Sequence, residues 1–293
     1  MNTAASVRER LEIQRKQAQM IAIAHIGVYL AAVVLIVLHL YVPAAIITGI
    51  NFLIYLFLVR GQIRHYSLAV SKANVLCGLC SPLESAQFTD RVGMSMKRFQ
   101  SLAVLPMVER EGSLLVRAAF SGQGYGLDLE GCEFTLHYAA PGARDKNQYR
   151  FLSGTLLTAE PRTGAWPGDW LLLRRGLLDE AAQSTFLEER GYTPASCPDG
   201  KLNDRFQLYA GDGVQEVPQW LARRLSRAAE QSDRLGAVRL TGKQAAVYLE
   251  NRFYTSRTKV RDLPNEKWLT HCPLPERDGM WELFRSLGAG EGA

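Results

Sequence analysis

The sequence predicts an α+β fold in which a transmembrane helical hairpin and a helical neck precede a mostly antiparallel sheet with helices. Two uncharged apolar runs lie near the N-terminus, and a helical segment follows them. From Gly112 onward, short and partly alternating segments are separated by glycine, proline and aspartate, which is typical of antiparallel strands. The predicted parts are a basic cytosolic segment (1–19), the hairpin (20–59), the neck (60–100), a cytosolic α+β domain (101–287) and a disordered tail (288–293).

The hairpin is predicted from length and composition. The first apolar run extends from Met20 to Tyr41 and the second from Val42 to Val59, and neither contains a charged residue. About 20 apolar residues cross a hydrocarbon core about 30 Å thick, whereas one helix containing both runs would be about 60 Å long. We therefore expect two spans and a tight turn, with Pro43 in the first turn of the second helix. A buried soluble hairpin is the alternative; a signal peptide would be shorter and followed by a cleavage site.

Basic residues flank the hairpin and set its expected orientation. Residues 1–65 carry six Lys or Arg and two Glu, whereas the remaining chain has 28 basic and 27 acidic residues. The excess positive charge therefore belongs to the N-terminal part, and no nucleic-acid partner is predicted. Basic flanks stay on the cytoplasmic side of a membrane. We expect a multi-pass protein of the inner membrane with both termini in the cytoplasm and the lipid bilayer as a partner.

Two polar residues lie deep within the apolar runs. His25 is near the cytoplasmic end of the first run and Asn51 near the middle of the second, so we expect them at different depths. Polar side chains at such depth face another helix, and interhelix hydrogen bonds are their expected role. A proton or ion path would use acidic residues, and the runs contain none. The hairpin is therefore predicted to be an anchor and not a transporter.

The cytosolic elements are predicted from periodicity and from turn residues. A helix over 61–83 continues the second span and ends at Ser81-Pro82, because the residue before a proline leaves the helical region. Strands are expected at 113–120, 127–139, 148–160, 169–175, 204–212, 236–242 and 244–254. Further helices are expected at 84–100, 177–191, 217–233 and 279–287.

Cys77 and Cys80 form a CxxC pair within the predicted helix 61–83. A redox dithiol needs its first cysteine at a helix N-terminus, where the dipole lowers the thiol pKa, but this pair lies near a helix end. Zinc needs four ligands, and the best remaining candidates are the adjacent His271 and Cys272. Packing of two small residues on one helix face is the preferred interpretation. The sequence predicts neither a metal site nor a cofactor, and it assigns no catalytic residue.

Other motifs carry weaker signals. The stretch 121–126, "SGQGYG", lacks the strand–loop–helix context of a phosphate-binding loop, so a hairpin turn is expected.

The helix 217–233 is amphipathic, with Trp220 assigned to its packing side, and its basic face could contact anionic headgroups. That face is assigned to Arg223, Arg224, Arg227 and Arg234. A second basic stretch, expected to be a loop, contains Arg252, Arg257, Lys259 and Arg261 near Tyr254. His137 and His271 have no recognisable nucleophile motif nearby.

The layout resembles a family of bacterial membrane proteins of unknown function that have two N-terminal transmembrane helices and a cytosolic α+β domain. The residues that carry this resemblance are "LEIQRKQ" (11–17), "YRFLSGTLL" (149–157, with Phe151 and Gly154) and "DRFQLYAGDGVQEVPQWLARRL" (204–225, with Phe206, Tyr209, Asp212 and Glu216). The resemblance implies a topology and a bacterial origin, and no catalytic residue follows from it. The residues themselves predict a strand, a turn at 211–213, and Asp212 as a cap of the next helix.

Two function classes remain open. The first is a binding or scaffolding module that recruits a protein partner, self-associates or senses a ligand at the inner membrane face. The second is a membrane-proximal hydrolase or transferase with an unrecognised active site. A deep pocket lined by His137, His271 or several carboxylates with shifted pKa values would favour the enzyme. A shallow, apolar exposed patch would favour the scaffold.

Overall fold

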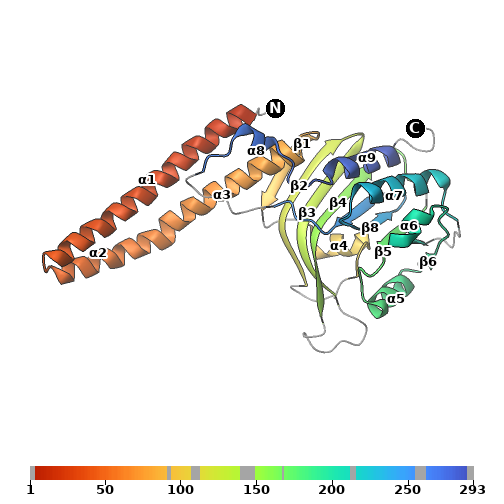
Figure 1. Ribbon diagram of the computed structural model, residues 1–293, viewed down its shortest axis with the longest axis horizontal. Coiled ribbons are helices and arrows are strands. Elements are labelled where there is room, and N and C mark those ends of the chain that lie inside the picture. Colours follow the sequence, from red (N-terminus) through yellow and green to blue (C-terminus); the bar gives the residue numbers. More distant parts are fainter. Residues whose placement is uncertain are drawn as a thin grey trace. The chain divides into compact units, whose positions relative to one another are not determined.

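The computed structural model describes residues 4–90, 94–106, 113–138, 149–166, 168–211, 216–254 and 262–288. The chain divides into two compact units. Unit 1 contains residues 1–81 and 255–272, and unit 2 contains residues 82–254 and 273–293. A C-terminal segment of the chain therefore belongs with the N-terminal helices, which are red to orange in Figure 1. The five parts predicted from the sequence are a finer division and stay a prediction.

Two long helices form the hairpin of unit 1. The first is α1 (Ala4–Val37), and the second runs continuously through α2 (Tyr41–Ile54), η1 (Tyr55–Val59), α3 (Arg60–Asn74) and η2 (Val75–Leu79), where η1 and η2 are π-helical turns. His39 has a positive φ of 60° in the turn between them, and Pro43 lies in the first turn of α2, as expected. Both helices are long and apolar enough to cross a membrane, by length and composition.

The polar residues of the hairpin contact each other. The Asn51 side-chain amide donates to the backbone oxygen of His25 over 3.1 Å, and Asn51 Oδ1 lies 2.8 Å from His25 Nδ1. The expectation of interhelix hydrogen bonds is confirmed, but the expectation of different depths is wrong. Because the turn occupies residues 38–40, the two residues are at nearly equal distances from it along antiparallel helices.

A short helix, α8 (Glu266–Thr270), packs against the polar end of the hairpin within unit 1. Leu269 of α8 is buried in a cluster with Leu11 of α1 and with Tyr66 and Val70 of α3. The Tyr66 hydroxyl also donates to the backbone oxygen of Asp262 over 2.7 Å. The sequence did not predict α8, because its five residues are too few for a helical period to be recognised.

The described part of unit 2 contains a nine-stranded sheet in the order β1-β2-β3-β4-β9-β8-β5-β7-β6, with antiparallel pairing throughout (Figure 1). The predicted α+β fold with a mostly antiparallel sheet is confirmed. The strands are β1 (Glu84–Asp90), β2 (Leu114–Gly124), β3 (Leu127–Tyr138), β4 (Arg150–Pro161), β5 (Trp170–Arg174), β6 (Thr193–Pro194), β7 (Phe206–Ala210), β8 (Leu235–Leu240) and β9 (Ala245–Leu249).

Helices cover both faces of the sheet. They are α4 (Met96–Leu102), α5 (Glu180–Glu189), α6 (Gly200–Arg205), α7 (Gln219–Gln231) and α9 (Arg277–Gly288). On one face, Phe134 of β3 shares a buried cluster with Phe99 of α4 and Phe186 of α5. On the other face, the ring centroids of Phe120 of β2 and Trp281 of α9 are 6.4 Å apart. Figure 1 shows α7 and α9 (light and dark blue) next to each other over the sheet.

The expected helix over 84–100 is wrong in its first half. Residues 84–90 form β1, which pairs antiparallel with β2 at the edge of the sheet, and a helix begins only at Met96. Ala86 and Phe88 alternate with polar residues, and pairing with β2 favours the strand over the local helical preference. The helix α6 was also not predicted. Residues 289–293 of the predicted tail lie outside the described residues.

Candidate functional site

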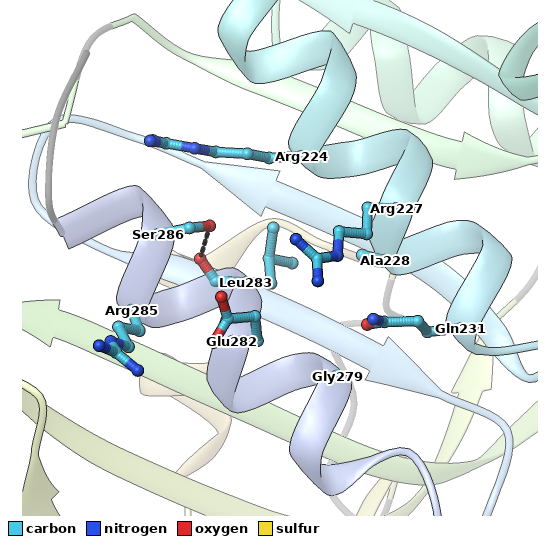
Figure 2. Close-up of a pocket in the computed structure, with 9 residues that line it drawn as sticks. All are labelled: Arg224, Arg227, Ala228, Gln231, Gly279, Glu282, Leu283, Arg285 and Ser286. Carbon is cyan, nitrogen blue, oxygen red and sulfur yellow. Dashed lines mark hydrogen bonds between the residues drawn. The ribbon is translucent and has the colours of Figure 1, made fainter. Parts of the chain in front are cut away.

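A cavity of about 420 Å³ lies between α7 and α9 in unit 2 (Figure 2). Its lining residues are Arg224, Arg227, Ala228, Gln231, Gly279, Glu282, Leu283, Arg285 and Ser286. Three guanidinium groups and one carboxylate give this lining a net charge of +2. The cavity therefore combines a concave shape with an excess of positive charge.

The two helices form this cavity because each has one apolar face. In α7, Leu221, Leu225 and Ala228 are buried, and the arginines occupy the other side. A Cβ at Gly279 would lie 2.7 Å from Oε1 and 3.3 Å from Cβ of Gln231, so α9 lies close to α7 at this position. The close crossing at Gly279 places the arginines of α7 opposite the polar side of α9.

Arg224 and Arg227 both extend from α7 toward α9, whereas the guanidinium of Arg285 points away from α7 (Figure 2). The guanidinium of Arg224 lies over the Trp220 ring, 4.8 Å from its centroid. Trp220, which the sequence analysis assigns to the packing side of the helix, is half-buried, whereas Leu221 and Leu225 are fully buried. Burial lowers the pKa of Arg224, because desolvation disfavours the charged form.

The neutral groups of the lining add hydrogen-bonding capacity. The Ser286 hydroxyl donates to the backbone oxygen of Leu283 over 2.8 Å, which leaves its lone pairs as acceptors. Gln231 presents an amide, and Glu282 is the one carboxylate of the lining. The lining contains no histidine or cysteine. Its chemistry suits recognition of a polar anion better than nucleophilic catalysis.

A second cavity, of about 440 Å³, lies on the opposite face of the sheet, beside α4 and strands β1 to β3. Arg98 lines it together with Glu130 and Cys132. The Arg98 guanidinium is paired with Glu160 and lies 3.9 Å from Glu130, so neighbouring carboxylates offset its charge. Burial raises the pKa of the Cys132 thiol to about 12. A thiol that stays protonated near neutral pH is a poor nucleophile.

Glu133 is the one charged residue among the buried residues of the described chain. It accepts a hydrogen bond of 3.0 Å from the backbone N–H of Tyr254. Burial raises its pKa above the ordinary value, although this hydrogen bond and the nearby Arg252 and Arg117 act in the opposite direction. Glu133 does not line either cavity described above.

Asp169, Tyr192 and Arg239 form the most extensively connected polar cluster that we describe. Arg239 donates to both oxygens of Asp169 at 3.3 and 3.0 Å, and the Tyr192 hydroxyl donates to Asp169 Oδ1 over 2.6 Å. Arg239 also donates to the backbone oxygen of Leu102 over 2.8 Å. Burial, followed by the bond to Asp169, raises the pKa of Tyr192. Because the groups satisfy one another, we assign this cluster to the fold.

Cys77 lies in the middle of η2 and Cys80 directly after it, within unit 1. Cys80 is buried and Cys77 is half-buried, which fits the packing interpretation. A Cβ at Gly78 would lie 2.4 Å from the backbone oxygen of His271, so η2 contacts the segment that carries the His271-Cys272 pair. No group of three or more His, Cys, Asp or Glu that could hold a metal ion occurs within the described ranges. The expectation of no metal or cofactor stays a prediction.

The histidines considered as markers of an enzyme, His137 and His271, belong to different units. His137 is exposed on β3, and its ring lies edge-on to Phe151 with the centroids 6.5 Å apart. His271 is exposed in unit 1. Neither lines either of the two cavities.

Other predicted features have structural roles or lie outside the described residues. The predicted hairpin within 121–126 is confirmed: residues 121–124 belong to β2, and Tyr125 and Gly126, both with positive φ, form the turn that joins β2 to β3. Of the second basic stretch, Arg252 is described; Arg257, Lys259 and Arg261 are outside the described residues, as are Asp212 and its expected cap.

The residues that carry the family resemblance have roles in the fold where they are described. A Cβ at Gly154 would lie 2.0 Å from the backbone oxygen of Leu249, so β4 and the end of β9 approach closely there. Phe206 and Tyr209 are buried in β7. Comparison of the chain with protein-family models, curated proteins and solved structures finds no match of any kind. The family resemblance stays a prediction.

The residues that α9 contributes to the α7–α9 cavity were not predicted from the sequence. Glu282, Arg285 and Ser286 occur in an ordinary amphipathic pattern, and nothing in that pattern indicates that α9 packs beside α7. The proximity of Gly279 to Gln231 is visible only once the two helices are paired. The basic face of α7 was the one feature of this cavity that the sequence indicated, and it was interpreted as a surface that could contact anionic headgroups.

Proposed function

We propose that the chain is a membrane-anchored binding module, in which the hairpin of unit 1 holds unit 2 at the cytoplasmic face of a bacterial inner membrane. The observation that carries this proposal is the exposure of large apolar side chains along both helices of the hairpin. Ile23 is 67% exposed, Leu30 62%, Val37 69% and Phe57 77%. A surface this apolar is stable in lipid and unfavourable in water.

The charge distribution supports the orientation. Arg8, Arg10, Arg15 and Lys16 precede the first apolar run, and Arg60 and Arg64 follow the second. The turn at 38–40 contains no Lys or Arg. The positive-inside tendency then places both termini in the cytoplasm.

Unit 2 supports a binding role through the α7–α9 cavity. Its arginines can hold an anionic group, and its lining lacks the histidine or cysteine that many transfer reactions use. The partner is either a protein that presents an anionic group or a small anionic ligand. A membrane-proximal hydrolase or transferase is the second candidate, and one observation favours it: the buried Glu133 carboxylate has a raised pKa, which is a feature of catalytic acids and bases.

Site-specific photo-crosslinking in intact cells tests the binding role. A photoreactive amino acid at the exposed Glu230 of α7, next in sequence to the lining residue Gln231, would report on partners that bind near the cavity, and the same amino acid at the exposed Glu189 of α5 is the matched control. The proposal predicts a discrete adduct from position 230, recovered in the membrane fraction and absent from position 189. Equal adducts at both positions, or a full-length protein found in the soluble fraction, would contradict it.

A further inference from the structure

We infer that the α7–α9 cavity binds the phosphate group of a larger molecule, through the guanidinium groups of Arg224 and Arg227. This inference rests on the proposed binding function and names the chemical class of the ligand. Arg224 and Arg227 are three residues apart on one helix, so their side chains leave α7 on the same side. Figure 2 shows both of them directed toward α9. Arg285 lies at the rim and adds positive charge there.

Guanidinium chemistry favours phosphate. Each guanidinium presents a planar fork of N–H donors that matches two oxygens of a phosphate group. The lining has a net charge of +2, which matches the charge that a phosphate monoester carries near pH 7. The Trp220 ring beneath Arg224 fixes one fork by a cation–π contact of 4.8 Å.

Burial of Arg224 gives a reason for an anion to bind there. Desolvation lowers the pKa of this arginine, so its positive charge is held in a less polar environment than water. An anion in the cavity would interact strongly with such a charge because water screens it less. The geometry of the cavity and the position of Arg224 in its lining agree with this electrostatic argument.

The second cavity provides an internal comparison. It has a similar volume, about 440 Å³, but its arginine, Arg98, is neutralised by Glu160 and Glu130. The lining of the α7–α9 cavity contains one carboxylate, Glu282, and three arginines, of which Arg285 points outward. The two cavities are therefore similar in volume and differ in the net charge of their lining residues.

The size of the α7–α9 cavity indicates that the phosphate belongs to a larger molecule. Its volume of about 420 Å³ falls in the range of about 300–1,000 Å³ that is typical of small-molecule sites. Gln231, Glu282 and Ser286 can hydrogen-bond to hydroxyl or amine groups attached to the phosphate. A soluble phosphate ester and a phospholipid headgroup share this chemistry.

The test adds inorganic phosphate, as the probe, to the full-length protein in maltoside micelles. Binding is measured from the linewidth of the phosphate signal in ³¹P NMR. The inference predicts broadening of the phosphate signal that excess sulfate reverses. Arg227→Ala should weaken binding by about tenfold, as for loss of one charge-assisted bidentate contact. Arg227→Lys should restore part of it. The control is Arg223→Ala, which removes an exposed arginine of α7 outside the lining and should change binding by less than about twofold.

A lipid arm separates the two sources of phosphate. The protein is placed in nanodiscs of phosphatidylcholine alone or with phosphatidic acid, and a spin-labelled phosphatidic acid reports contact. If Arg227→Ala reduces the contact with the spin-labelled lipid and Arg223→Ala does not, the ligand is a phospholipid headgroup. If the protein binds inorganic phosphate but makes no such lipid contact, the ligand is a soluble phosphate ester. No phosphate binding at millimolar concentration and no lipid contact, or equal effects of the two variants, would overturn the inference. If phosphate and lipid binding both fail but the crosslinked adduct at position 230 is still found, the proposed binding function holds and only the ligand class is wrong.

Discussion

Asn74 joins η2 and α3 to the C-terminal segment of unit 1, and its replacement gives the sharpest prediction for this unit. Its side-chain amide donates to the backbone oxygens of Trp268 and His271, each over 3.0 Å. These oxygens belong to the end of α8, where a helix has no partners of its own for its last carbonyl groups. Asn74→Ala removes both bonds and leaves the carbonyls without this donor.

A buried hydrogen bond contributes about 0.5–1.5 kcal/mol net, so the two bonds of Asn74 together contribute about 2 kcal/mol. That free energy corresponds to about a 30-fold change in the opening equilibrium of the segment 262–272. Hydrogen–deuterium exchange of the full-length protein in micelles, read by mass spectrometry on peptides from this segment, measures the change directly. Because the segment opens locally, exchange in unit 2 should stay the same.

The matched control is Gln62→Ala, which removes an amide from an exposed position of the same helix. It should leave exchange in 262–272 unchanged. Equal exchange of this segment in Asn74→Ala and in the wild type would refute the reasoning. A uniform rise over the whole chain would also refute it, because the effect would then be global unfolding and not release of α8.

Three further predictions concern other parts of the fold. Gly154→Ala places a Cβ 2.0 Å from the backbone oxygen of Leu249, so thermal unfolding should show a free energy of unfolding lower by about 2 kcal/mol or more. The control is Gly200→Ala, which has open space around the new Cβ and should change the free energy of unfolding by less than about 0.5 kcal/mol. Burial raises the pKa of Glu133, so the folded state binds more protons than the unfolded state above the ordinary pKa of 4.5, and stability falls as pH rises through that window. Glu133→Gln should remove this fall, and an unchanged pH dependence of thermal unfolding would contradict the assignment. Asn51→Leu should weaken the hairpin by about 1 kcal/mol in an SDS titration in mixed micelles, and no shift of the midpoint would argue against the hydrogen bonds to His25.

The sequence predicted the elements whose pattern is local. The apolar runs, the long strands of 127–138 and 150–161, and the amphipathic helix 219–231 each repeat a clear period over many residues. The strand at 84–90 and the short helix at 266–270 depend on partners that are distant in the sequence, β2 for the first and α3 for the second. Local preference contains no information about those partners.

The depths of His25 and Asn51 were predicted wrongly for a different reason. Their positions were judged from the ends of the apolar runs, whereas the turn at 38–40 decides which residues are level. Half of the candidate site was predicted from the sequence. The arginines of α7 were recognised as a basic helix face, but the packing of α9 beside α7 depends on tertiary structure. Gly279, which lies close to Gln231 of α7, has no distinguishing sequence context.

The central claim is that a membrane hairpin holds unit 2 on the cytoplasmic side. Reporter fusions in a bacterial host test it most directly: a fluorescent protein that matures only in the cytoplasm is joined after Ala293, and alkaline phosphatase, which is active only outside it, is joined after His39 in the turn. The account predicts fluorescence in an alkaline-resistant membrane pellet and an active phosphatase. A dark C-terminal fusion, an inactive phosphatase or fluorescence released into the soluble fraction would contradict it.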